Sequence, residues 1–282
     1  MSTVRSWLVT ALGAASLAGL AAADGDTALL GAALDDAAAI NGGAVYVYVR
    51  GVTGGWSIQQ ILRPASPAVD ALFGSALALK SNTAIIGARG DSDSRHGGAA
   101  YVFRRSGNAW TQTARIAPSD LSDYGAFGNS VAYDGVTIAV GMAPPGGESP
   151  GTGGLRLFED QGTTFPQVAQ LGDDGSNEFG ASVAVRGNLL IAGAPEAQID
   201  DGTSSGPIRQ AGNAYLFQRV NGIWLMAAGL RGTGHDLFPI TSGDYFGTSV
   251  ALDGGTAFVG SVFDRTAATA AGAAFVFDLS GN

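Results

Sequence analysis

The residues of this 282-residue chain that could do chemistry are mainly carboxylates. The sequence has 24 Asp and Glu residues, two histidines and no cysteine, which excludes disulfides, thiolate metal sites and thiol nucleophiles. The histidines, His96 and His235, stand far apart and in no pattern typical of a serine hydrolase or a zinc protease. Catalysis would need carboxylates that folding brings together, as in glycan-cleaving enzymes, whose two acids lie roughly 5–10 Å apart. A hydrolase or lyase acting on polysaccharide is therefore one hypothesis, although the sequence favours a protein that is not an enzyme.

The elements that would position these carboxylates are marked by Phe-Gly pairs. The pairs recur at intervals of roughly 50–70 residues, which is typical of propellers and other arrays of repeated sheets. Small residues at equivalent positions allow strands to approach closely, and the phenylalanine beside each glycine fills the space between sheets. We therefore interpret the pairs as structural. They are Phe73-Gly74, Phe127-Gly128, Phe179-Gly180 and Phe246-Gly247.

Each repeat is predicted to contain four β-strands. Two apolar runs separated by a polar turn, often Asp-Gly, form a first hairpin, and a Gly-led run followed by an aromatic-led segment forms a second. The leading aromatic residues are Trp56, Trp110, Phe165 and Trp224, which we expect to pack between outer strands. The fifth repeat ends after its third run. The predicted fold is all-β, a propeller of about five four-stranded antiparallel blades, because a solenoid would leave more open sheet edges. The repeats are about 17–72, 73–126, 127–178, 179–245 and 246–282.

These Phe-Gly pairs, together with the Gly-Ala strand ends at 31–32, 87–88 and 193–194, resemble FG-GAP repeats. The chain is similar to bacterial FG-GAP proteins and, more distantly, to the propeller of integrin α subunits. The resemblance implies a secreted or surface-displayed propeller used for recognition, with catalysis only in unusual members. Integrin-type blades often carry a calcium loop of the form Asp-x-Asp-x-Asp-Gly-x-x-Asp. Here the nearest match, Asp24-Gly25-Asp26, offers two carboxylates where calcium takes six to eight oxygen ligands, so those sites do not carry over.

The long connections of the predicted blades gather on one face, and most of the acids lie on them. Rigid scaffolds present function on such loops, and a negative field could attract a cation or a basic partner. The fourth repeat carries two insertions on this face, at 195–211 and 231–245, which form the best candidate patch. Its candidate binding residues are Asp200, Asp201, His235, Asp236, Asp244 and Tyr245. Weaker candidates for a metal site are Asp91, Asp93, Asp173 and Asp174.

The net charge of the chain limits the classes of partner that it can bind. A net charge of −9 argues against nucleic acid, whose binding depends on Lys and Arg neutralising phosphates. The main hypothesis is a noncatalytic, extracellular or cell-surface recognition scaffold that binds a protein or glycan through the long loops. The alternative is a module that binds a divalent cation on the acidic face. We expect no cofactor, with calcium left open, and the sequence does not determine the oligomeric state or the ligand.

The N-terminus has two interpretations. Residues 1–16 with the apolar run that follows are typical of a secretory signal that ends in small residues at 21–23, and the run is short and Ala/Gly-rich for a membrane anchor. We therefore expect no integral membrane protein once the chain is folded. Alternatively, 17–23 is the first strand of the first repeat, and 7–12 supplies the strand that the fifth repeat lacks and closes the ring. The propeller domain would then span 17–282, and a portion of a larger, perhaps seven-bladed, parent is a third hypothesis.

Overall fold

The computed structural model describes residues 21–91, 97–120, 125–142, 153–172, 178–198, 208, 210–231, 243–264 and 271–280. In these residues it contains five antiparallel sheets and no helix, which confirms the all-β prediction. We call the sheets blades one to five in chain order.

The blades have these strands. Blade one contains β1 (Ala21–Asp24), β2 (Thr27–Ala32), β3 (Ala44–Arg50) and β4 (Trp56–Leu62). Blade two contains β5 (Phe73–Lys80), β6 (Thr83–Ala88), β7 (Ala99–Ser106) and β8 (Ala109–Ile116). Blade three contains β9 (Phe127–Tyr133), β10 (Thr137–Met142), β11 (Gly154–Glu159) and β12 (Gln167–Leu171). Blade four contains β13 (Ser182–Arg186), β14 (Leu189–Ala194), β15 (Asn213–Val220) and β16 (Ile223–Leu230). Blade five contains β17 (Phe246–Asp253), β18 (Thr256–Ser261) and β19 (Ala273–Asp278).

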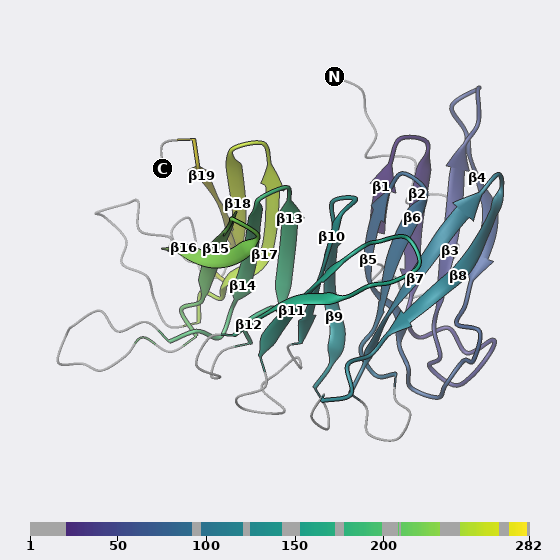
Figure 1. The fold of residues 1–282 in the computed structure, drawn as a ribbon, viewed down its shortest axis with the longest axis horizontal. Helices are drawn as coiled ribbons and strands as arrows, with labels where there is room; N and C mark the ends of the chain where they lie inside the picture. The colour runs from purple at the N-terminus through teal and green to yellow at the C-terminus, as the bar shows by residue number, and fades with distance from the viewer. Residues whose placement is uncertain are drawn as a thin grey trace.

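Each blade is a meander in which neighbouring strands along the chain pair antiparallel. The blades stack in chain order through their first two strands, and Figure 1 shows blades one and five at opposite ends of the row. The tight turns within each blade lie at one end of the strands, which we call the hairpin face. The connections between second and third strands and between blades lie at the other end, which we call the loop face. The sheets are those of propeller blades, and the described residues form an open row of five.

The Phe-Gly pairs determine how blades stack. Gly128 has φ of 91°, a left-handed conformation that favours glycine, and the register of the first strand shifts beside it. Its carbonyl oxygen lies so close to Gly87 of the preceding blade that a Cβ there would overlap it. Phe127 is fully buried in the core between blades two and three, beside Ile85 and Val102. The structural interpretation of the pairs is therefore confirmed.

Two strand boundaries refine the expected pattern. The fourth strand of blade three begins at Gln167, after the aromatic residue Phe165, because Pro166 has no N–H to donate to a strand ladder. In blade one, Ala21–Asp24 pairs with β2, with Ala22 opposite Leu29, as expected for a first strand. Residues 1–20, including the segment proposed as a signal or a ring-closing strand, lie outside the described part of the chain.

Candidate functional site

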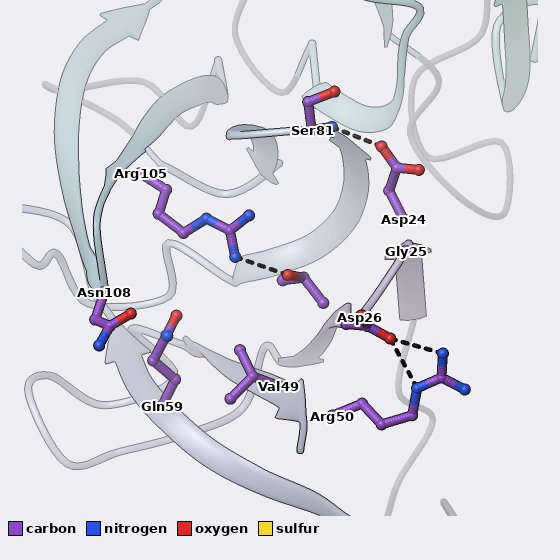
Figure 2. A pocket seen from close by; sticks show the side chains of 10 residues that line it. Asp24, Gly25, Asp26, Val49, Arg50, Gln59, Ser81, Arg105 and Asn108 are labelled. Carbon is purple, nitrogen blue, oxygen red and sulfur yellow. Dashed lines mark hydrogen bonds and ion pairs between the residues drawn. The ribbon is translucent and has the colours of Figure 1, made fainter. Parts of the chain in front are cut away.

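The hairpin face carries a pocket between blades one and two, with a volume of about 480 Å³ (Figure 2). The residues that build it come from the β1–β2 turn, the turn after β5, the β7–β8 turn, the start of β2, the ends of β3 and β7, and the middle of β4. Nearly all of its lining side chains are polar. The lining residues are Asp24, Gly25, Asp26, Thr27, Val49, Arg50, Gln59, Ser81, Arg105 and Asn108.

The two carboxylates of the pocket are engaged in holding its walls. The Oδ2 atom of Asp24 accepts a hydrogen bond from the backbone N–H of Ser81 at 2.6 Å, which joins the first turns of blades one and two. The Oδ1 atom of Asp26 accepts from Nε of Arg50 at 2.8 Å. In Figure 2 Asp24 and Asp26 point away from each other toward these separate partners. The residues closest to an integrin-type calcium loop thus bind protein groups instead.

Arg105 crosses from blade two into the pocket and is held from three sides. Its Nε donates to Oδ1 of Asn82 at 2.9 Å, and one terminal nitrogen donates to Oγ1 of Thr27 in blade one at 2.8 Å. The guanidinium also lies 5.4 Å from the ring centre of Trp110. Because each contact removes rotational freedom, this cation is pre-organised before any ligand arrives.

Two amides complete the polar wall. Oε1 of Gln59 accepts from the indole Nε1 of Trp110 at 3.2 Å, so its orientation is fixed by the neighbouring blade. Asn108 is exposed at the tip of the β7–β8 turn. Two acids, two arginines and two amides give a site of balanced charge that offers donors and acceptors together. Such a set suits binding of a neutral, hydroxyl-rich molecule.

On the loop face, Asp91 is the metal candidate that the structure describes, and it is buried. Its Oδ2 accepts from the Tyr101 hydroxyl at 2.6 Å and from Arg115 Nε at 2.9 Å. Burial, together with this carboxylate, raises the pKa of the Tyr101 hydroxyl well above its ordinary value. The carboxylate of Asp91 is therefore already occupied by a phenol and a guanidinium from its own blade.

Blade one repeats this arrangement with other residues. Asp35 accepts from the Tyr46 hydroxyl at 3.2 Å and from a terminal nitrogen of Arg63 at 2.9 Å. Partial burial alone would raise the pKa of Asp35, but the hydrogen bonds and charge of Arg63 hold it below its usual value. Acids near the loop face thus serve the loops' own structure in two blades.

Of the candidate binding residues on the fourth-repeat patch, the structure describes Asp244 and Tyr245. Asp244 is buried, and its backbone carbonyl accepts from Oγ of Ser261 at 2.7 Å. Tyr245 has φ of 54° and packs edge-to-face on Phe263, with ring centres 5.6 Å apart. The remaining candidates lie outside the described residues, so the structure does not show whether the patch assembles. They are Asp93, Asp173, Asp174, Asp200, Asp201, His235 and Asp236.

Comparison with known families detects three repeats in this chain. The family model for the FG-GAP repeat matches residues 56–103, 110–153 and 240–277. This chain contains FG-GAP repeats. No curated protein matches the chain. FG-GAP repeats occur in extracellular recognition and adhesion proteins and generally act as noncatalytic scaffolds.

Two of the matched ranges begin in the last strand of one blade and continue into the next blade, and blade four lies outside all three ranges. Residues 56–103 run from the last strand of blade one through the third strand of blade two, and 240–277 cover the three strands of blade five. Among the described residues, no helix could span a membrane, and no group of three or more His, Asp or Glu is placed to hold a metal.

The sequence analysis did not predict the hairpin-face pocket, because it chose the candidate binding face by the number of acids and the length of the loops. The available signal was an arginine at the end of a third strand, followed by a polar turn and an aromatic residue. It occurs at Arg50 before Trp56, at Arg105 before Trp110 and at Arg219 before Trp224. The first two arginines lie over the tryptophan that follows and line the pocket.

Proposed function

We propose that this protein is a noncatalytic extracellular or cell-surface recognition scaffold, and that the hairpin-face pocket binds a neutral glycan. The observation that carries the proposal is the pocket lined by polar side chains of balanced charge, several of them held by hydrogen bonds to the protein. Sugar hydroxyls donate and accept at once, and they match a wall of carboxylates, amides and guanidinium groups. The family supports the scaffold role, since FG-GAP repeats occur in recognition and adhesion proteins.

The size and stiffness of the pocket favour a short stretch of sugar. About 480 Å³ lies within the range of roughly 300–1,000 Å³ that small-molecule sites have. The pocket is joined across two blades by Asp24 with Ser81 and by Arg105 with Thr27, so its walls need little rearrangement on binding. Trp110 does not offer a stacking platform here, because it is 2% exposed.

The test is a glycan array followed by calorimetry with the best neutral oligosaccharide. Asn108→Ala should weaken binding about fivefold, since one lost hydrogen bond to a ligand costs on the order of 1 kcal/mol. Asn188→Ala, in the exposed first turn of blade four on the same face, is the matched control and should bind as the parent does. If no glycan binds, or if both variants bind equally well, the glycan proposal is wrong.

A second candidate function is protein binding on the loop face, as the long loops predict. Three large apolar side chains are exposed on two adjoining connections: Leu34 at 65%, Ile40 at 64% and Val69 at 57%. The connections are joined by the N–H of Asp70 and the carbonyl oxygen of Ile40 at 2.8 Å. Exposed apolar side chains that gather on one surface often mark protein contacts.

Binding at the loop face and binding at the hairpin-face pocket can be distinguished by introducing a carboxylate on the loop face. Ile40→Asp should abolish capture of a protein partner while leaving glycan binding unchanged, and Val136→Asp, at an exposed turn of blade three, is the control. Replacing loop 195–211 tests the candidate patch of blade four in the same assay. Unchanged capture after both replacements would contradict binding through the loop face.

We further propose that the scaffold works without a resident cofactor. The engagement of Asp24, Asp26, Asp35 and Asp91 by protein groups supports this for these four acids. The melting temperature should then be equal in calcium and in chelator, whereas a ligand present at one hundred times its Kd would stabilise the fold by about 2.7 kcal/mol. A rise of several degrees in calcium would favour the cation-binding alternative. Turnover in a polysaccharide screen would favour the hydrolase or lyase.

A further inference from the structure

One side of blade five repeats a surface that the other blades bury. We call the side of a blade that faces the next blade along the chain its forward face. In blade five, Ala251, Phe258 and Val276 lie opposite one another across the three strands, and Ser249, Gly260 and Ala274 form the neighbouring row.

The same two rows exist in blade two and are covered there. Ala78, Ile85 and Val102 form one row, and Ala76, Gly87 and Ala100 form the other. Both rows pack against blade three. Ile85 and Val102 are fully buried, whereas their counterparts Phe258 and Val276 are 40% and 63% exposed.

Gly260 shows what kind of surface is expected opposite it. In blades one to four, the glycine at this position lies against the carbonyl oxygen of the Phe-Gly glycine of the following blade. The pairs are Gly31 with Gly74, Gly87 with Gly128, Gly141 with Gly180, and Gly193 with Gly247. At Gly260 the three nearest atoms to a built Cβ all belong to Ser249 of the same blade. Blade five thus has the glycine that permits close approach of a following blade.

Ser249 adds a directional group. In blades three and four the serine at this position donates to the same carbonyl oxygen: Ser130 to Gly180 at 2.7 Å and Ser182 to Gly247 at 2.8 Å. Ser249 holds the equivalent place beside Gly260 and is exposed. Blade five therefore has the features that form the interface between successive blades. They are the small residue Gly260, the Ser249 hydroxyl beside it, and the exposed apolar side chains of Phe258 and Val276.

We propose that the forward face of blade five docks a β-sheet blade of a partner polypeptide whose first strand opens with Phe-Gly. The partner's glycine carbonyl would accept from Ser249, and its phenylalanine and flanking apolar residues would cover Phe258 and Val276. A side chain at the partner's glycine would block this contact, as a Cβ would at Gly128 opposite Ala99. The surface therefore selects a blade of the FG-GAP type over other apolar proteins.

The experiment uses the full chain, whose lack of cysteine makes Val276→Cys a unique thiol. A second copy of residues 73–126 is added after Asn282 through a flexible linker that contains a protease site. Docking should slow alkylation of the thiol about tenfold or more, because reaction then requires local opening. After the linker is cut, the added blade should co-elute with the chain and the thiol should stay protected.

Two controls fix the interpretation. Gly74→Leu in the added copy keeps its length and composition but prevents the close approach, and it should restore the alkylation rate of the unextended chain. Val136→Cys, exposed on blade three, should react equally fast in every version. An unchanged rate for Val276→Cys in the extended chain would overturn the proposal. Protection that is lost once the linker is cut would overturn docking of a separate polypeptide.

Discussion

At the scale of single residues, the buried carboxylate of Asp91 is satisfied by a phenol and a guanidinium group of its own blade. Asp91 is 5% exposed, and a buried charge is tolerated when hydrogen bonds and an opposite charge compensate for lost hydration. Tyr101 and Arg115 supply both. An acidic residue on a long loop is therefore not by itself a sign of ligand binding in this fold.

Asp91→Asn should lower the free energy of unfolding by about 1–3 kcal/mol, because the buried Tyr101 and the Arg115 guanidinium lose their charged acceptor. Asp70→Asn is the matched control. Its exposed carboxylate accepts from the Asn41 side chain at 2.7 Å, and the change should stay within about 0.5 kcal/mol. Denaturant unfolding measures both, and equal losses would show that the buried group contributes nothing special.

The ionisation of Tyr133 should make the free energy of unfolding depend on pH in the alkaline range. Burial raises the pKa of Tyr133 to about 12, together with Asp160, whose Oδ2 accepts a hydrogen bond from the Tyr133 hydroxyl at 2.6 Å. The ordinary value is near 10, so the unfolded chain loses this proton first. The resulting stabilisation is complete below about pH 10 and is lost as pH rises toward 12. Tyr133→Phe should flatten the fall in unfolding free energy over this interval, measured by denaturant titrations, and an unchanged slope would contradict the assignment.

At the scale of elements, the stacking of blades depends on glycines that face one another across the interface. A Cβ at Gly141 would overlap both the carbonyl oxygen of Gly180 and Oγ of Ser130. These atoms belong to a backbone and to a hydrogen-bonded side chain, so neither can move without separating blades three and four. The same geometry recurs between every pair of successive blades.

Gly141→Ala should therefore destabilise the protein by about 3 kcal/mol, at the upper end of what overpacking costs. Gly172→Ala is the control, since a Cβ there has nothing within 4 Å. That change should be neutral or stabilise the fold by up to about 1 kcal/mol, because alanine restricts the unfolded chain. Thermal and denaturant unfolding test both variants, and similar melting temperatures would contradict the close-approach argument.

At the scale of the whole molecule, the repeat pattern predicted the blades because each Phe-Gly pair serves a local geometric need. The glycine adopts positive φ and the phenylalanine fills the gap between sheets, so both leave a mark in sequence. The hairpin-face pocket is harder to predict from the sequence, because Asp24 and Arg105 belong to different blades. Only the stacking of blades one and two brings them together. On the loop face, Asp91 stands near Asp93 in the sequence, but in the fold its carboxylate accepts hydrogen bonds from Tyr101 and Arg115, which lie farther along the chain.

Stability should also vary along the row of blades. In a linear array each repeat is held by its own strands and by its interfaces with neighbours, so a repeat with one covered side opens more readily. Blade three is covered on both sides, whereas the forward face of blade five exposes Phe258 and Val276. Amide hydrogens of β18 should therefore exchange faster than those of β10, although both strands are central in their sheets. Hydrogen exchange followed by mass spectrometry measures the two strands in one sample. Equal protection would mean that the row unfolds as a single unit and that the exposed face does not weaken its last blade.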